Sequence, residues 1–316
     1  MPDPASSVLR LGTRGSLLAR AQSGLVAQSL ERLHPGLKVE LVLFRTSGDQ
    51  IAERPLHEFG GKGLFTKELE QALLDGAIDF AVHSFKDVPV TIPLVDQADL
   101  ITAAVPARED PRDMLVTADG RALRDLPQGA RVGTGSLRRR SQLLALRPDL
   151  RVELIRGNID TRLRKCRSGE YGAVILALAG LRRAGLLDSA TMSVIDPGQM
   201  LPAPGQGALS LQCRREDQRT RDYLAALNDP VSASCVSAER ELVRLLAGDC
   251  HSPIAALAEP DGAEGVRFNA AVGAREGNPP VLRAGRSVKL AQLPAAAGEL
   301  FSELAALGAP QLLAGK

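Results

Sequence analysis

The segment VLRLGTRGSLLARAQSGLVAQSLERLHPGLKVELVLF, residues 8–44, carries the pattern that decides the fold. Residues 8–13 are an apolar, strand-like run, and the amphipathic stretch that follows is helical and ends at Pro35. Residues 37–44 are strand-like again, and residues 67–84 repeat the order of a helix and then a strand. Strands and helices that alternate in this way predict an α/β sheet with parallel strands.

A second segment of similar size, residues 130–180, has the same alternation of strand-like runs and helices. The Pro- and charge-rich residues 105–116 separate the two segments and indicate a boundary. Residues 200–213 hold two Pro and two Gly before another strand, and we interpret them as a hinge where the chain crosses back. The predicted domains are residues 1–104 together with 202–221, residues 105–201, and a C-terminal α+β domain of residues 222–316.

Composition places the chain among globular proteins. Its 316 residues are 44% hydrophobic and 24% charged, with a net charge of +2, which excludes disorder for most of the chain. No apolar run reaches the ~18 residues that a membrane-spanning helix needs, and no secretory signal is visible. We therefore expect a cytoplasmic protein that has no membrane partner.

The four cysteines indicate reduced thiols rather than a metal site. Cys166, Cys213, Cys235 and Cys250 form no CxxC pair, and the chain has only four His, so no metal is expected. Cys250 lies in the loop LLAGDCHSPIAA after a helix, where it is more accessible than Cys166 or Cys213. An inert loop thiol is the alternative interpretation.

Arginine is concentrated in one part of the chain. Residues 131–167 contain ten of the 32 Arg and one Lys against three acidic residues. Three of these, Arg138, Arg139 and Arg140, begin a predicted helix, where the helix dipole disfavours positive charge. A bound polyanion would offset this cost, and a solvated basic face is the alternative. Only nine aromatic residues occur and none is Trp, so small polycarboxylate or phosphate ligands fit better than nucleic acid.

Three turns between a strand and a helix indicate where such an anion would bind. They are LGTRGS (11–16), VGTGSLRRR (132–140) and IRGNIDTR (155–162), and each carries Arg. Backbone N–H groups at a helix N-terminus attract anions, and in an open α/β sheet these turns meet at the carboxyl ends of the strands. Ordinary turns are the alternative for any one of them.

Two further motifs are candidates for chemistry. In HSFKDVP (83–89), Asp87 follows a strand and lies beside Lys86, where it could accept a proton or stabilise a developing cation. A surface Lys–Asp pair is the alternative. The Gly-rich stretch FGGKGLF (59–65) is not a nucleotide-binding P-loop and is interpreted as a flexible lid loop of Gly60, Gly61, Lys62 and Gly63.

Taken together, these segments resemble the porphobilinogen deaminase family, also called hydroxymethylbilane synthases. The similarity covers most of residues 8–257, in the order of the family, and is weak over the last sixty residues. The matching stretches are LGTRGSLLARAQ, GGKGLFTKELEQALLDGAIDFAVHSFKDVP, GTGSLRRRSQL, IRGNIDTRL, ILALAGLRRAGL, LPAPGQGALSLQCR and AERELVRLLAGDCHSPIA.

The resemblance implies a fold and an activity. The fold would be two α/β domains like type II periplasmic binding proteins, plus a small C-terminal α+β domain. The activity would be transfer chemistry of tetrapyrrole and heme biosynthesis: four porphobilinogen molecules are joined head to tail, with loss of ammonia, into linear hydroxymethylbilane. The growing oligopyrrole would extend a dipyrromethane cofactor bound through a thioether to Cys250. Asp87 would be the catalytic residue that stabilises the cation formed as ammonia leaves.

The resemblance also accounts for the arginines, because each pyrrole ring brings an acetate and a propionate. Porphobilinogen and the growing chain would be the only partners of a monomeric protein. The side chains that would contact the cofactor and substrate carboxylates are Arg14, Ser16, Lys86, Ser136, Arg138, Arg139, Arg156 and Arg162.

The sequence departs from the family pattern at a few positions. Gly135 stands where the family often has Ser, Asp249 stands before Cys250 where Gly is common, and His251 and Ser252 follow it. Ser47 replaces a common Arg. The competing interpretations are a non-catalytic periplasmic-type anion-binding protein and an ATP-using phosphoribosyltransferase on the same architecture. HSFKDVP and the Cys250 segment have no role in the second of these.

Overall fold

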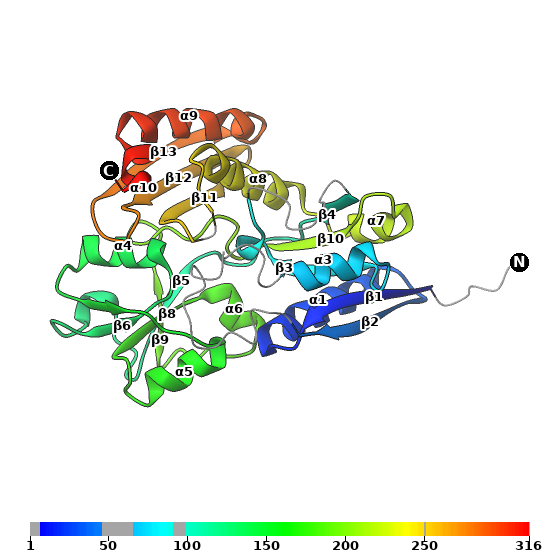
Figure 1. The fold of residues 1–316 in the computed structure, drawn as a ribbon, viewed down its shortest axis with the longest axis horizontal. Coiled ribbons are helices and arrows are strands. Elements are labelled where there is room, and N and C mark those ends of the chain that lie inside the picture. Colours follow the sequence, from blue (N-terminus) through cyan, green and yellow to red (C-terminus); the bar gives the residue numbers. More distant parts are fainter. Residues whose placement is uncertain (1–6, 46–65, 91–98, 250, 316) are drawn as a thin grey trace, which may run out of the picture. The chain divides into compact units, whose positions relative to one another are not determined.

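The structure is a computed structural model, and it describes residues 7–45, 66–90, 99–249 and 251–315 (Figure 1). The backbone divides into two compact units. The first unit comprises residues 1–108 and 208–233, and the second comprises residues 109–207 and 234–316. No helix in the described ranges is long and apolar enough to cross a membrane.

The first unit is built on a five-stranded sheet with the order β2-β1-β3-β10-β4. β1 is parallel to β2 and β3, whereas β10 is antiparallel to both of its neighbours. The strands are β1 (Ser7–Arg14), β2 (Leu37–Phe44), β3 (Phe80–Ser84), β4 (Leu100–Ala104) and β10 (Leu209–Arg214). The helices are α1 (Leu17–Leu33), α3 (Lys67–Leu74) and α7 (Gln218–Ala225), with the 3-10 turn η2 at Phe85–Asp87.

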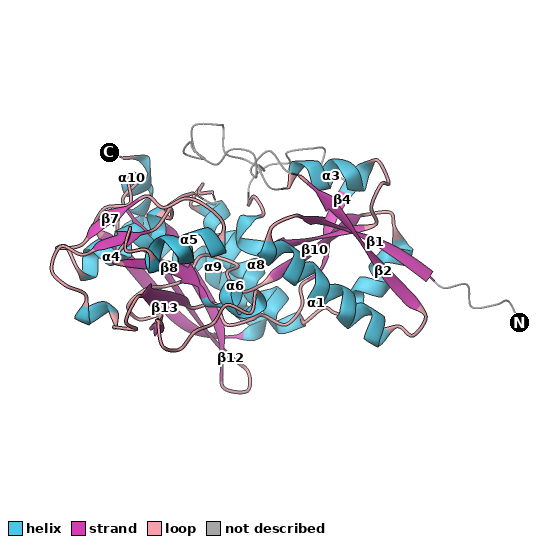
Figure 2. Ribbon diagram, turned by 90° about the horizontal axis from the view of Figure 1, so that it is seen from below, coloured by secondary structure: helices cyan, strands magenta, loops and turns pink. Residues whose placement is uncertain are grey.

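Alternation along β3 divides the core of this unit into two layers, because successive side chains of a strand point to opposite faces. Phe80 and Val82 belong to an apolar cluster with residues of α1, including Leu30. Ala81 belongs to a second cluster with Leu69 and other residues of α3. The two helices accordingly lie on opposite faces of the sheet (Figure 2).

The second unit contains another five-stranded sheet, with the order β7-β6-β8-β5-β9. β6 is parallel to β7 and β8, and β5 is antiparallel to β8 and β9. The strands are β5 (Asp113–Thr117), β6 (Arg131–Gly133), β7 (Arg151–Glu153), β8 (Ala173–Ala177) and β9 (Met192–Ile195). The helices are α4 (Leu137–Leu146), α5 (Ile159–Arg167) and α6 (Leu178–Arg183), with the 3-10 turn η4 at Leu123–Asp125.

The same unit holds a three-stranded antiparallel sheet, β11-β12-β13. Its strands are β11 (Ile254–Asp261), β12 (Gly265–Gly273) and β13 (Val281–Lys289). α9 packs on β12 and β13 (Figure 1), and the fully buried Phe268, Leu300 and Leu304 lie in these elements. The remaining elements are α8 (Pro230–Leu245), the 3-10 turn η5 (Leu290–Gln292), α9 (Leu293–Ala306) and α10 (Ala309–Ala314).

Both five-stranded sheets share one plan, in which an antiparallel strand from a distant part of the chain is inserted beside the last strand. In the first sheet this strand is β10, which follows residues 200–208, and in the second it is β5, which follows β4. The expected α/β fold class is confirmed: two five-stranded α/β sheets of this plan are present, together with a smaller C-terminal antiparallel sheet and its helices.

Candidate functional site

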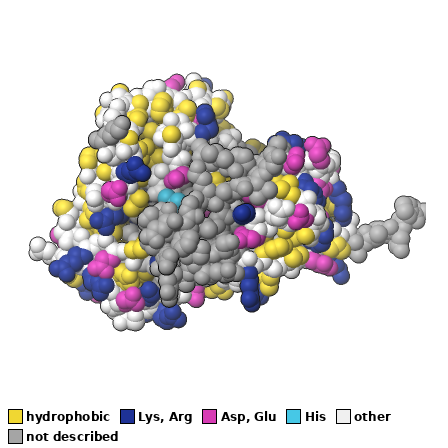
Figure 3. Space-filling model, viewed as in Figure 1, with side chains coloured by type: hydrophobic (Ala, Val, Ile, Leu, Met, Phe, Trp, Pro, Cys, Tyr) yellow, Lys and Arg dark blue, Asp and Glu magenta, His cyan; other side chains and the backbone are white. Residues whose placement is uncertain are grey.

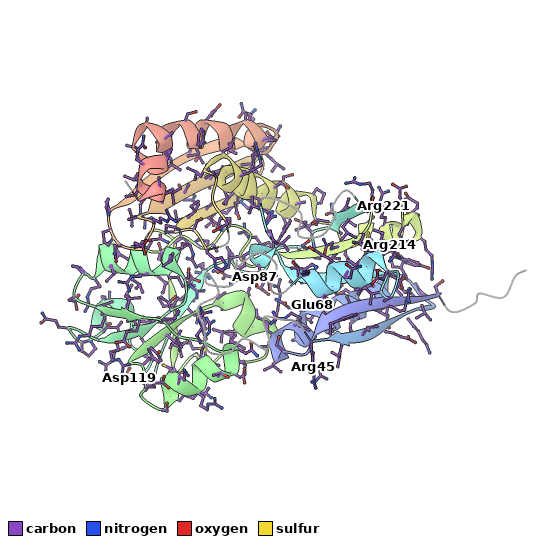
Figure 4. All side chains as sticks on the ribbon, viewed as in Figure 1. Arg45, Glu68, Asp87, Asp119, Arg214 and Arg221 are labelled. Atoms are coloured by element: carbon purple, nitrogen blue, oxygen red, sulfur yellow. The ribbon has the colours of Figure 1, made fainter. Side chains whose placement is uncertain are left out.

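Asp87 lies in η2, directly after the central strand β3 of the first sheet (Figure 4). The turn is held by the sheet, because the backbone N–H of Phe85 donates to the carbonyl of Ala208 over 3.0 Å. The hydroxyl of Ser84 lies 3.1 Å from the side-chain nitrogen of Gln22, which comes from α1. Asp87 is exposed, so its carboxylate is available to a ligand at the end of a fixed strand.

Arg14 and Ser16 lie at the same edge of the sheet as Asp87. Arg14 is the last residue of β1, which runs parallel to β3, so the carboxyl ends of both strands meet there. Ser16 is the N-cap of α1, and its hydroxyl accepts from the backbone N–H of Ala19 at 3.3 Å. With Lys86, two cationic side chains, a helix N-terminus and one carboxylate are brought to one edge.

The second unit contains a buried cluster that joins two guanidinium groups to one carboxylate. Arg138 and Arg139 are 3% and 5% exposed, and Asp113 is fully buried. Nη1 of Arg138 lies 2.7 Å from Oδ2 of Asp113, and Nη2 of Arg139 lies 2.8 Å from Oδ1. Each guanidinium also donates to a backbone carbonyl. Nη1 of Arg138 donates to the carbonyl of Leu201, and Nη1 of Arg139 donates to the carbonyl of Ile175.

The charges of this cluster do not balance. Burial opposes ionisation of Asp113, but the charges and hydrogen bonds of Arg138 and Arg139 outweigh it and hold the pKa of Asp113 far below its usual range. Two guanidinium groups against one carboxylate leave a surplus positive charge. The Nε atoms of both arginines are buried and have no hydrogen-bond partner in the described part of the chain. The cluster therefore carries the surplus positive charge that favours a nearby anion.

The turns of the second sheet bring further cations to the edge where this cluster begins. Ser136 is the N-cap of α4 and accepts from the backbone N–H of Arg139 at 3.4 Å. β6 and β7 are parallel, so the turn after β6 and the half-buried Arg156 after β7 lie at the same sheet edge. Arg162 is half-buried on α5, and its Nε donates to the carbonyl of Gly157 at 2.8 Å.

Cys250 and the lid loop of Gly60, Gly61, Lys62 and Gly63 lie outside the described residues, as does Ser47. The neighbours of Cys250 are described. Oδ1 of Asp249 accepts from the backbone N–H groups of His251 and Ser252, both at 2.9 Å, and from the Ser252 hydroxyl at 2.9 Å. Asp249, a departure from the family pattern, thus makes Asx-type hydrogen bonds to His251 and Ser252.

The three other cysteines are buried. Burial, assisted by Asp217, raises the pKa of Cys213 to about 11, and burial also raises the pKa of Cys166. A buried thiol with a raised pKa is a poor nucleophile. Within the described ranges no cluster of His, Cys, Asp and Glu side chains could hold a metal ion.

Sequence reasoning missed two side chains of the buried cluster. Asp113 lay in the stretch interpreted as a domain boundary, yet it begins β5 and pairs with arginines 25 and 26 residues away. Gln206 donates to Oδ1 of Asp113 at 2.8 Å from 93 residues away. One feature of the sequence could have indicated the role of Asp113. This acidic residue directly precedes the apolar run MLV in a chain that is rich in arginine.

Charged side chains on the face shown in Figure 3 are interspersed, with Lys and Arg next to Asp and Glu over the described surface. The cations of the second unit named above are instead buried or half-buried at one sheet edge. Fold and site together define a class of protein: a two-unit α/β protein in which guanidinium groups gather at one sheet edge of the second unit.

Comparisons with known proteins identify the family within this class. Residues 9–222 match the family model "Porphobilinogen deaminase, dipyromethane cofactor binding domain", and residues 233–298 match "Porphobilinogen deaminase, C-terminal domain". The chain belongs to the porphobilinogen deaminase family, as its sequence motifs predicted.

Curated relatives match over most of the chain. A porphobilinogen deaminase of Syntrophotalea carbinolica is 46% identical over 310 residues, which cover 98% of this chain and 96% of the relative. A porphobilinogen deaminase of Sorangium cellulosum is 53% identical over 254 residues, which cover 80% of this chain and 83% of the relative. An amino-acid ABC transporter extracellular-binding protein of Bacillus subtilis, a solved structure, is 12% identical with a TM-score of 0.41, covering 70% and 90%.

Proposed function

We propose that this chain is a transferase that joins four porphobilinogen molecules, with loss of ammonia, into linear hydroxymethylbilane. The growing oligopyrrole extends a dipyrromethane bound through a thioether to Cys250. The observation that carries the proposal is the buried Arg138–Asp113–Arg139 cluster, because its surplus charge and unpartnered Nε atoms suit a polycarboxylate ligand. Family membership supplies the identity of that ligand.

The residues present fit the cofactor. A dipyrromethane carries four carboxylates, and the second unit offers Ser136, Arg138, Arg139, Arg156 and Arg162 to such groups. Charge-assisted hydrogen bonds contribute about 1.5–3 kcal/mol each, and a buried charge without a partner is costly. When bound, the cofactor supplies the free pyrrole position to which the first porphobilinogen is added.

Asp87 has the position and the charge for the chemical step. Loss of ammonia leaves a positive charge spread over the pyrrole ring of porphobilinogen. An exposed carboxylate at a rigid strand end accepts the pyrrole N–H and stabilises that charge as it develops. Arg14, Ser16 and Lys86, at the same edge, hold the acetate and propionate of the incoming ring.

The proposal includes the remaining organisation expected from the sequence. The catalytic domains are residues 1–104 with 202–221 and residues 105–201, and residues 222–316 carry the cofactor cysteine. The lid loop at residues 60–63 covers the bound chain. The protein is monomeric and cytoplasmic.

The intact mass of the purified protein tests the covalent link. The parent protein should exceed its sequence mass by one dipyrromethane and should react with Ehrlich's reagent, whereas Cys250→Ser should have its sequence mass and no activity. Ser252→Ala, which alters the same turn but keeps the thiol, should retain the added mass. If the parent protein makes hydroxymethylbilane at full rate and has no added mass, the covalent link is contradicted. If the parent protein is inactive and has only its sequence mass, it is an anion-binding protein instead.

Asp87→Asn tests the catalytic role, since it keeps the size of the side chain and removes its charge. Turnover should fall by about 10²-fold or more, the cost typical of removing one electrostatic stabiliser, while the cofactor mass is retained. Asp75→Asn, an exposed acid of the same unit, should leave turnover unchanged. An equal loss of cofactor and turnover in Asp87→Asn would mean that Asp87 is structural.

A further inference from the structure

A buried polar chain lies between the first sheet and α3, and the proposed function assigns it no role. It consists of Glu70 on α3, Gln212 on β10 and His83 on β3, which are 0%, 8% and 6% exposed. Nε2 of His83 lies 2.9 Å from Oε1 of Gln212, and Nε2 of Gln212 donates to Oε1 of Glu70 at 3.4 Å. We call these three residues the Glu70–Gln212–His83 chain.

The amide of Gln212 gives this chain a direction. A carboxylate oxygen only accepts, so the –NH2 end of the amide faces Glu70 and the oxygen faces His83. His83 must then carry its proton on Nε2. The ring stays neutral, because burial lowers the pKa of His83 to about 4. The hydrogen bond to Gln212 opposes this shift in part, and the charge of Arg14 adds a smaller lowering. Gln212 therefore sets both the tautomer and the orientation of the imidazole.

The chain fixes the end of the strand that leads to Asp87. On the opposite face of the sheet, Phe80 and Val82 anchor β3 in an apolar cluster. On the face toward α3, the side chains of β3 are the small Ala81 and then His83, four residues before Asp87. Polar contacts, rather than apolar packing, hold this side of the strand end. Directly after the strand, the backbone N–H of Phe85 donates to the carbonyl of Ala208, the residue before β10.

We propose that Gln212 is a positioning residue for the reaction. It orients His83 and, through the end of β3, holds the Asp87 carboxylate where the positive charge develops. Gln212 is buried on β10 and acts only through its neighbours. This inference rests on the proposed function, since only that function makes the position of Asp87 consequential.

Two substitutions of Gln212 separate positioning from packing. Gln212→Leu fills the same space but breaks both hydrogen bonds, so kcat should fall about tenfold while KM stays within twofold and the dipyrromethane mass is retained. Gln212→Glu restores the chain only while Glu70 and the new carboxyl share one proton, because two adjacent carboxylates cannot both ionise cheaply. Its kcat should be close to the parent value at low pH and should fall as pH rises.

The charged groups that bear on this pH profile are Glu70 of α3 and Arg14 of β1, whose charge acts on His83. Thr102→Val is the matched control. The hydroxyls of Thr102 on β4 and Ser210 on β10 lie 2.8 Å apart, and Ser210 shares a sheet face with Gln212. Losing this contact should leave kcat and its pH profile within twofold of the parent.

The measurements are steady-state kinetics from pH 6 to 9 and intact mass for each variant. A tenfold loss in Gln212→Leu with a new basic limb in Gln212→Glu supports the proposal. Parent-like kcat in Gln212→Leu, or a parent-like pH profile in Gln212→Glu, overturns it. If Gln212→Leu does not fold, the Gln212→Glu profile decides. A parent protein that forms no hydroxymethylbilane defeats the proposed function itself, and this inference with it.

Discussion

Asp113 accepts hydrogen bonds from three side chains of the second unit: Arg138 and Arg139 at the start of α4, and Gln206 in the turn before β10. A buried carboxylate is stable only when it is fully paired, and here the pairing comes from two guanidinium groups. The same interactions hold both guanidinium groups in place. Under the proposed function, a guanidinium that is already fixed loses less entropy on binding a carboxylate than a mobile surface arginine does.

Asp113→Asn should therefore be strongly destabilising. Removing the charge leaves two buried guanidinium groups without a counter-ion, and breaking such a pair costs about 3–5 kcal/mol. The control is Glu153→Gln, which breaks an exposed pair with Arg131 at 2.7 Å and should change the free energy of unfolding far less. Urea denaturation of both variants measures the difference. Equal losses would show that the cluster contributes no more than a surface pair.

His83 should make the protein less stable as the solution is acidified. Its pKa is about 4 in the folded protein, chiefly because of burial, against 6.5 for an exposed histidine, so the unfolded chain binds the proton first. The contribution of neutral His83 to the free energy of unfolding is constant above pH 6.5. This contribution, about 3 kcal/mol in total, is lost as the pH falls from 6.5 to 4.

Urea denaturation at pH 7 and pH 4.5 checks this contribution. His83→Gln has no group that titrates in this range, so its free energy of unfolding should fall less than that of the parent between the two pH values. Identical pH dependence in the two proteins would mean that His83 is protonated inside the folded protein without cost.

At the scale of elements, helix N-termini serve both folding and binding. Ser16 and Ser136 cap α1 and α4, and neither helix has an acidic residue in its first turn. α4 begins instead with three arginines, the residue type that the helix dipole disfavours at that end. The cap and the pairing of Arg138 and Arg139 with Asp113 offset this cost, and a bound carboxylate would offset more of it.

Substitutions of Ser136 should separate these two roles. Ser136→Ala removes the cap and should lower the free energy of unfolding by about 1 kcal/mol. Ser136→Asp keeps a capping acceptor and adds a charge that the dipole favours, so stability should be retained. The added charge repels an acidic cofactor, so intact mass should show less dipyrromethane in Ser136→Asp than in Ser136→Ala. Equal cofactor content would place Ser136 outside the binding site.

Elements with a regular apolar period were predictable from the sequence. The run at residues 37–44 is β2 as expected, and the helix expected from residue 137 is α4. The strand expected at residues 77–84 begins only at Phe80, because Gly76 has a φ of +67° and residues 77–79 complete the turn after α3. β5 was not predicted, since its place in the sheet depends on pairing with β8 and β9.

The candidate site was predictable only in part, for a related reason. Arg138 and Arg139 stand out as a local cluster. Nothing in a linear pattern shows that they pair with Asp113 across 25 and 26 residues, or that Gln206 donates to Asp113 across 93 residues. His83 and Gln212 likewise meet only because β3 and β10 pair in the sheet. The local sequence shows where an unusual number of arginines occurs. The partners of those arginines depend on which distant segments the tertiary fold brings together.

At the scale of the whole molecule, the surplus positive charge should make stability depend on the cofactor. Cys250→Ser, which cannot hold dipyrromethane, should melt at least ~5 °C below the parent, since each charge-assisted hydrogen bond contributes about 1.5–3 kcal/mol and each kcal/mol corresponds to about 2–4 °C. Added sulfate should raise the Tm of Cys250→Ser more than that of the parent. Differential scanning calorimetry measures both, and equal Tm values would mean that the arginines do not hold the cofactor.

The inserted strands have a consequence for how the chain is completed on the ribosome. β10 separates β3 from the edge strand β4 in the first sheet, so β3 keeps one unpaired edge and β4 has no neighbour in this sheet until residue 214 has been synthesised. All five strands of the second sheet lie between residues 113 and 195, so that sheet can close earlier, although its strands are translated later than β1 to β4. The nascent N-terminal strands must therefore wait with open edges, which are the usual sites of mispairing.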